Sequence, residues 1–410
     1  MTMRRFMTAR AFASAVVVAV GTLLAAPASA AQLTAVPSIS LEGGWDSNIF
    51  DVSTNEESDI VMRAIPGLAL YFDAFQTKTE LSGRFEFEWY ADNRELEDNP
   101  ATIDLRLSAA EPMRLTPRFS LSPFVGYLET SDSFRRTQLI APPVTGIPPS
   151  NQIITGRTKS RDYRAGITTK YLVSRRVDFN FGVGAAKTDF LSDTTDQGQD
   201  DSRTIYGDTS VDYRFNTRFS SGVYLRANYD TYSVSPDSQT ISAGLQGEYR
   251  IEQYYTLSGR AGVAHSQQDA DPTTEGTDYW RPTGSLSFGY TKKYFSANLT
   301  ASSEPTGGSG FGVITDQFTV YLSLTDQFAE RWWWDLSGSY QRNKSIDEPT
   351  DENIDTWWGG AGIRYTATKW ASFYLKGDVN RQRSSAGVAA EIDRETVSAG
   401  VTLSTNYLVF

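Results

Sequence analysis

One alternating stretch constrains the fold of this chain most strongly. In residues 79–90, apolar and polar side chains take turns residue by residue. The apolar set is Leu81, Gly83, Phe85, Phe87 and Trp89, and the polar set is Glu80, Ser82, Arg84, Glu86 and Glu88. A period of two residues predicts a β-strand, because successive side chains of a strand point to opposite faces. A soluble sandwich and a membrane barrel with a wet interior both fit one such strand.

The same alternation recurs from residue 38 to residue 403, and the connections between the alternating segments differ in length. Short connections, such as 173–176 and 216–218, take turns with long ones, such as 91–101 and 129–160. This order is typical of an up-and-down barrel with short turns at one end and long loops at the other. We therefore predict an all-β fold, a transmembrane up-and-down antiparallel β-barrel of about 18 strands, with 16 as the alternative.

Residues 1–30 have the pattern of a secretory signal peptide. Arg4, Arg5 and Arg10 precede an apolar run over 11–26, and Ala28-Ser29-Ala30 is a small-residue cleavage site. We expect residues 31–410 to form a single barrel domain in the outer membrane of a Gram-negative cell, exported through the periplasm. The barrel would then contact outer-membrane lipid and lipopolysaccharide.

The composition argues against several functional classes. The chain has no cysteine, and its one histidine, His265, leaves no room for a Ser-His-Asp site or a multi-histidine zinc site. A formal net charge of -11 is unfavourable for binding nucleic acid. We predict that the protein is not an enzyme and uses no cofactor or metal.

The polar faces of the strands supply the residues of the predicted lumen. Its charged members are expected to be Arg84, Glu86, Arg106, Arg164, Asp208, Arg214, Arg226, Arg260 and Arg364. They can pair across neighbouring strands and support the barrel, or create a field that orients a polar solute. The aromatic members are expected to be Tyr206, Tyr224, Tyr321, Trp358 and Tyr374. Their rings can stack on sugars, although Trp358 can equally belong to an aromatic girdle.

The long loops suggest two further hypotheses about the outer mouth. They carry many more acidic than basic residues, which predicts a negative mouth and cation-preferring conductance, or a polymer cargo shielded by divalent ions. The loop 129–160 is rich in proline and folds into the mouth as a constriction or lies on the surface. A structural adhesin that displays these acidic loops is another interpretation.

The first hairpin resembles a known family. The segment Pro37 to Phe50, PSISLEGGWDSNIF, and the strand segment Ile65 to Leu70, IPGLAL, are similar to the β-barrel porin 2 family. The resemblance implies an outer-membrane barrel linked to exopolysaccharide synthesis and export. It favours a conduit for exopolysaccharide, with a polysaccharide cargo and periplasmic export partners. The alternative is a general diffusion porin for small polar solutes.

Overall fold

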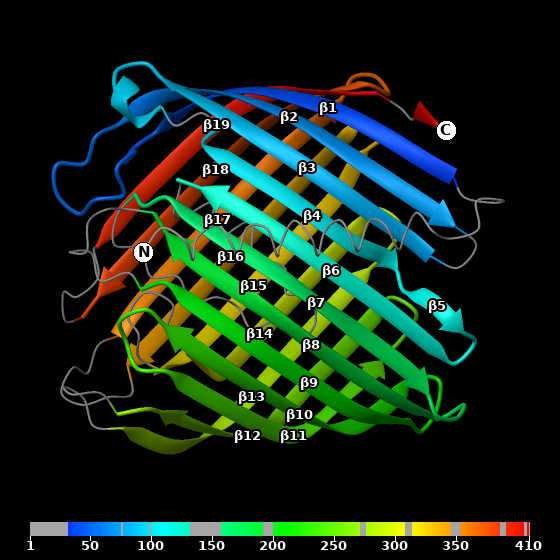
Figure 1. Ribbon diagram of the computed structural model, residues 1–410. Coiled ribbons are helices and arrows are strands. Elements are labelled where there is room, and N and C mark those ends of the chain that lie inside the picture. Colours follow the sequence, from blue (N-terminus) through cyan, green and yellow to red (C-terminus); the bar gives the residue numbers. More distant parts are fainter. Residues whose placement is uncertain are drawn as a thin grey trace, which may run out of the picture.

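The structure, a computed structural model, is a single closed ring of antiparallel strands (Figure 1). It describes residues 32–74, 77–97, 100–131, 157–191, 200–270, 276–307, 314–345, 353–385, 391–405 and 408–409. The predicted signal peptide, residues 1–30, lies outside the described residues.

The strands follow one another around the wall in chain order. They are β1 (Gln32–Asp46), β2 (Asp59–Ala74), β3 (Thr77–Tyr90), β4 (Thr102–Glu111), β5 (Met113–Thr116), β6 (Phe119–Thr130), β7 (Ser160–Leu172), β8 (Val177–Phe190), β9 (Ser202–Arg214), β10 (Phe219–Tyr232), β11 (Ser238–Arg250), β12 (Tyr255–Gln268), β13 (Thr277–Thr291), β14 (Phe295–Gly307), β15 (Ile314–Ala329), β16 (Trp332–Ser345), β17 (Asn353–Thr366), β18 (Ala371–Ser384), β19 (Ile392–Ser404) and β20 (Leu408–Val409). The one described helical segment is the 3-10 turn η2 (Arg94–Leu96). No helix among the described residues is long and apolar enough to cross a membrane.

Pairing between the first and last long strands closes the barrel. The register of β1 and β19 runs from Ser38 opposite Ser404 to Asp46 opposite Thr396. The short strand β5 extends the line of β4 along β6, and β20 extends the line of β19 along β1. The 20 strands of the sheet therefore make 18 passes of the wall, which confirms the predicted 18-strand up-and-down barrel.

The two ends of the barrel differ in their connections, as the sequence predicts. Short turns such as 173–176 and 215–218 gather at one end, called the short-turn end below, and the longer connections gather at the other, the long-loop end (Figure 1). The bounds of several long loops were predicted wrongly. Strands extend into both ends of the loops predicted at 265–278 and 341–355, because β12 continues to Gln268 and β13 begins at Thr277, while β16 continues to Ser345 and β17 begins at Asn353. Backbone pairing continues where apolar alternation has stopped, since the ladder needs no apolar side chains.

The outside of the wall is an apolar band. Leu245, Leu286 and Leu299 are exposed by 64%, 57% and 44%. Continuous apolar surface of this extent needs apolar surroundings. Rings gather toward the strand ends, for example Tyr255 and Tyr290 with centroids 4.6 Å apart near the short-turn end. Rings with a polar tip are favoured at the level of lipid headgroups.

The two faces of β14 give a direct test of this arrangement. Leu299 points outward and Asn298 points into the lumen. Leu299→Arg should lower the free energy of unfolding by about 2–4 kcal/mol in lipid vesicles, because a guanidinium is costly on the lipid-facing surface. Asn298→Arg, one residue away, should change it by less than about 1 kcal/mol. Urea unfolding followed by tryptophan fluorescence measures both, and equal losses in the two variants would contradict the assignment of the faces.

Candidate functional site

The candidate site is the polar lumen, and ion pairs identify its face. Arg106 Nε lies 2.8 Å from Asp104 Oδ1, and Arg84 Nη2 lies 3.7 Å from Asp104 Oδ2, so the polar faces of β3 and β4 meet. Arg226 Nη1 on β10 lies 2.8 Å from Glu304 Oε2 on β14. These strands are not neighbours, so their side chains meet across the concave inner surface. Arg84, Arg106 and Arg226 therefore lie on the inner face.

Within several lumen pairs, the cation is exposed and the carboxylate is buried. The side chains of Arg84 and Arg106 are exposed by 41% and 46%, and that of their partner Asp104 by 11%. Lys170 and Arg214 are exposed by 45% and 43%, and both pair with Asp178, which is exposed by 5%. A short carboxylate stays close to the wall, whereas a long basic side chain extends past it into water. The wetted surface of these strands is therefore cationic, although the whole chain is acidic.

A dense ion network lies in the wall near the long-loop end. Arg63 on β2 lies 2.8 Å from Glu42, 3.2 Å from Glu86 and 2.8 Å from Glu88. All four side chains are exposed by 7% or less. Lys376 Nζ extends from β18 to within 3.6 Å of Glu42. Glu86, expected on the solute path, is thus enclosed in a network that joins β1, β2 and β3.

The first long loop folds inward over this network. Ile49 packs in a buried cluster with Val61 and Tyr90. The Asn48 side chain donates to the carbonyl oxygens of Val52 at 2.7 Å and Asp393 at 3.0 Å, which ties the loop to β19. The sequence motif that resembles a known family therefore has a structural role as an inward-folded loop.

Arg394 on β19, next to the Asp393 contact, also holds this loop. Its guanidinium bonds to Asp46 at 2.6 Å and to Asp51 at 3.1 Å, and all three side chains are nearly fully buried. Asp51 adopts a φ of 55°, a left-handed conformation that most residues avoid. The ion pair with Arg394 helps to stabilise this turn.

The loop 129–160, expected either to constrict the mouth or to lie on the surface, is described only at its ends, since residues 132–156 lie outside the described part of the chain. Its described end nevertheless contacts the inner surface. Arg157 donates to the carbonyl oxygen of Ile49 at 3.2 Å, lies 3.5 Å from Glu88, and covers the Tyr90 ring at 5.3 Å. Arg157 therefore packs against the inward-folded loop around Ile49.

Two predicted arginines pack against the opposite part of the wall. The Arg226 side chain is exposed by 12%, and the Arg260 guanidinium covers the Tyr224 ring at 5.5 Å. Asp208 lies on the inner face of β9, directly opposite Arg226 in the strand register. This group narrows the lumen beside β9 to β14.

Other predicted charged residues have different surroundings. Arg214 is one of the exposed cations described above and forms an ion pair with Asp178. The Arg364 guanidinium lies over the Trp333 ring at 5.6 Å. Arg164 lies on β7 opposite Gly126 and Ala186. The structure therefore brings Arg84, Arg106 and Arg214 to the wetted surface and packs Arg226, Arg260 and Arg364 against other side chains.

The predicted aromatic residues mostly lie flat against the wall. Tyr206 is only 4% exposed and covers Gly184 on the neighbouring strand. Tyr374 covers Gly400, and its hydroxyl donates to Glu42 at 2.9 Å. Glycine leaves the space that each ring fills, so little ring surface is left for stacking on a sugar.

Three other rings complete the predicted set. Tyr224 lies over Gly262, and Trp358 lies near Gly360 on its own strand. Tyr321 is partly buried on β15. The single histidine lies outside the lumen, where His265 Nε2 is 2.6 Å from Asp278 Oδ1 and its ring is 4.7 Å from that of Trp280.

Several lumen residues were missed by sequence reasoning. Glu42 and Asp46 share the polar face of the first strand, so the alternation itself could have identified them. Arg157 lies in a predicted loop, where no periodic signal exists. Among the described residues, no group of three or more acidic or histidine side chains is arranged to hold a metal ion.

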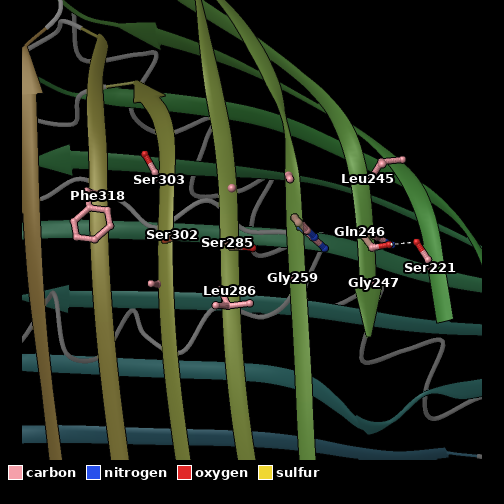
Figure 2. Close-up of a pocket in the computed structure, with 14 residues that line it drawn as sticks. Ser221, Leu245, Gln246, Gly247, Gly259, Ser285, Leu286, Ser302, Ser303 and Phe318 are labelled. Carbon is pink, nitrogen blue, oxygen red and sulfur yellow. Dashed lines mark hydrogen bonds between the residues drawn. The ribbon is translucent and has the colours of Figure 1, made fainter. Parts of the chain in front are cut away.

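A cavity of about 590 Å³ lies over β10 to β15 (Figure 2). Small residues such as Gly247, Gly259 and Gly284 line it together with Leu245 and Leu286. Both leucines are more than half exposed on the outer surface. This cavity therefore faces the surroundings of the barrel and is not part of the lumen.

Comparisons with known proteins identify no family for this chain. No protein-family model matches the sequence, and no curated protein sequence matches it. The fold is similar to the solved structure of Pseudomonas aeruginosa OccK3 (OpdO), with 12% identity, 91% of this chain and 96% of that chain covered, and a TM-score of 0.46. It is also similar to P. aeruginosa OccK2 (OpdF) in complex with glucuronate, with 10% identity, 91% of this chain and 98% of that chain covered, and a TM-score of 0.45. A third similar structure is Acinetobacter baumannii OccAB4, with 12% identity, 93% of this chain and 99% of that chain covered, and a TM-score of 0.46.

At 12% identity or less, these structures show a likeness of fold alone. The family resemblance of the first hairpin likewise stays a prediction.

The buried network predicts an unequal response to two arginine substitutions. Arg63→Met should cost about 3–5 kcal/mol of unfolding free energy, because it leaves buried carboxylates without their central cation. Arg106→Met removes an exposed lumen arginine and should cost about 1 kcal/mol or less. Urea unfolding of the lipid-embedded barrel, read by gel mobility, measures the difference. A similar small loss in both variants would mean that the network is unimportant for stability.

Proposed function

We propose that the protein is an outer-membrane channel through which small, anionic, polar solutes diffuse. The apolar exterior supports a membrane location, and the polar interior of a wide barrel supports an aqueous path. One observation carries the preference for anions. In the lumen pairs of Asp104 and Asp178, the cations extend into water and the carboxylates stay at the wall.

The exposed cations form two pairs on different parts of the wall. Arg84 and Arg106 lie on the neighbouring strands β3 and β4, and Lys170 and Arg214 lie on β7 and β9 beside a shared carboxylate. Within each pair, a carboxylate solute can exchange from one cation to the other, because both lie beside the same aspartate. Because each cation already has an aspartate beside it, binding should be weak enough for release.

The size of the path favours small solutes over a polymer. The inward-folded loop around Ile49, together with Arg157, occupies part of the mouth. The Arg226–Glu304 pair crosses a corner of the lumen. A monosaccharide-sized solute can pass such obstacles, whereas an exopolysaccharide needs a continuous open path. These obstacles favour the general diffusion porin over the exopolysaccharide conduit. The conduit and its periplasmic export partners stay predictions.

The acidic outer loops favour cations, whereas the exposed lumen cations favour anions. The distance of each set of charges from the solute decides between them. Salt screens exposed charges over about 8 Å at physiological ionic strength. Loop charges around a wide mouth act through more water than the lumen cations, which lie beside the solute. We therefore infer that the lumen sets the preference, contrary to the cation preference expected from loop composition alone.

The reversal potential in planar bilayers under a salt gradient tests this proposal. The protein should prefer chloride to potassium, and the variant Arg84→Gln, Arg106→Gln, Lys170→Gln and Arg214→Gln should lower the anion-to-cation permeability ratio by about threefold or more. A matched variant, Arg118→Gln, Arg175→Gln, Arg218→Gln and Lys292→Gln, removes the same charge from the short turns outside the strands and should leave the ratio nearly unchanged. A cation-selective wild-type channel would refute the proposal.

Solute size separates the two transport hypotheses. Entry of a sugar acid monomer, measured by swelling of protein-containing vesicles, should exceed entry of its longer oligomers. Equal entry of monomer and long oligomer would favour the exopolysaccharide conduit instead.

A further inference from the structure

A second charged surface lies on the outside of the barrel, at the long-loop end of β6 to β9. The outward residues of these strands alternate with the lumen residues, so Tyr163, Lys187 and Arg203 share the outer face with the exposed Ile167 and Ile205. The strand register places Glu129, Arg161 and Asp189 in one row across β6, β7 and β8. Tyr127, Tyr163, Lys187 and Arg203 form the next row toward the centre of the barrel.

The carboxylates of this patch are drawn inward and its cations extend outward. Glu129 is exposed by 10% and pairs with Arg161 at 2.8 Å and with Lys159 at 3.1 Å, whose side chains are exposed by 39% and 30%. Lys187 pairs with Asp189 at 2.6 Å, with exposures of 40% and 21%. The outermost surface of the patch is therefore basic.

Asp201 is a further carboxylate beside the patch, next to the start of β9. Its carboxylate accepts a hydrogen bond from the backbone N–H of Phe190 at 2.7 Å. Burial raises the pKa of this carboxyl group above its usual value. The backbone thus satisfies one hydrogen bond of this carboxylate, and Lys187 favours its charged form.

Lys187 and Arg203 are direct partners in the register of β8 and β9. Like charges directly opposite each other in a sheet are destabilising. Lys187 has Asp189, but within the described part of the chain no carboxylate lies at ion-pair distance from Arg203, which is exposed. An anion placed between Lys187 and Arg203 would remove the repulsion.

The position of the patch along the barrel axis indicates the source of that anion. The Tyr127 and Tyr163 rings lie 5.2 Å apart, directly beside Lys187 in the register. Tyrosine rings are favoured at the boundary between lipid tails and headgroups. Below them the outer surface is apolar, with Ile167 and Ile205 exposed by 41% and 44%. The cations therefore lie at the level of the headgroups of the outer leaflet.

We propose that Arg161, Lys187 and Arg203 bind a phosphate group of the lipopolysaccharide headgroup. Guanidinium groups match phosphate oxygens with two parallel hydrogen bonds, and lysine adds a mobile charge. The acyl chains of the same lipid lie along the apolar surface below. This site rests on the outer-membrane location proposed above, but it is separate from the lumen.

Lipid binding to the purified full-length mature protein tests the site. Native mass spectrometry with added lipid A should give binding about tenfold weaker for Lys187→Gln/Arg203→Gln than for wild type, since a loss of about 1.4 kcal/mol is a factor of ten. The control Arg175→Gln/Arg218→Gln removes the same charge at the short-turn end of the same strands and should bind as wild type does. Equal affinity of the Lys187→Gln/Arg203→Gln variant and wild type would overturn the proposal.

Two further arms need no variant. Dephosphorylated lipid A should bind about tenfold more weakly to wild type, and equal binding of the two lipids would refute a phosphate site. Millimolar inorganic phosphate should not displace lipid A; displacement would show a site for free phosphate instead. The reversal potential of the same preparations distinguishes the two proposals. If wild type binds both lipids equally and its conductance is still anion-selective, this inference alone is overturned.

Discussion

Satisfaction of backbone hydrogen bonds without water is the constraint on which the structure depends. In lipid, an unpaired N–H or C=O costs several kcal/mol, so a sheet can cross only when it has no free edge. Pairing of β1 with β19 provides this closure, and the remaining neighbours follow one another around the ring. Once the ring is closed, successive residues of each strand must point alternately to the lumen and to the outer surface. The chemistry of the lumen and of the outer surface is then set by odd and even positions.

Side-chain length decides which charge reaches the water in the Asp104 and Asp178 pairs of the lumen. Acidic and basic residues both lie on the inner face, yet Asp178 is 5% exposed while its partners Lys170 and Arg214 are each exposed by more than 40%. The same relation holds outside, where Glu129 is enclosed by Arg161 and Lys159. A chain with a net negative charge can therefore present basic surfaces on both faces of its barrel wall. Net charge alone would suggest the opposite.

The sequence was sufficient for the barrel, because alternation and loop order depend only on local patterns. It predicted that Arg84 and Arg106 lie on the inner face, since they share the polar side of their strands. It could not predict that Tyr206 covers Gly184, because that contact depends on the register between β8 and β9. The enclosure of Glu86 by Arg63 and the inward fold around Asn48 likewise need contacts between distant strands. Strand ends were misplaced where pairing continues into polar sequence.

The most direct test of the account is reaction of single cysteines with charged, membrane-impermeant thiol reagents, since the natural chain has no cysteine. On β15, Ser323 points into the lumen and Leu324 points outward. In the lipid-embedded protein, Ser323→Cys should react, and faster with an anionic than with a cationic reagent, whereas Leu324→Cys should stay unreacted. Equal reaction at both positions, or faster reaction of the cationic reagent at Ser323→Cys, would contradict a cationic, water-filled lumen enclosed by lipid.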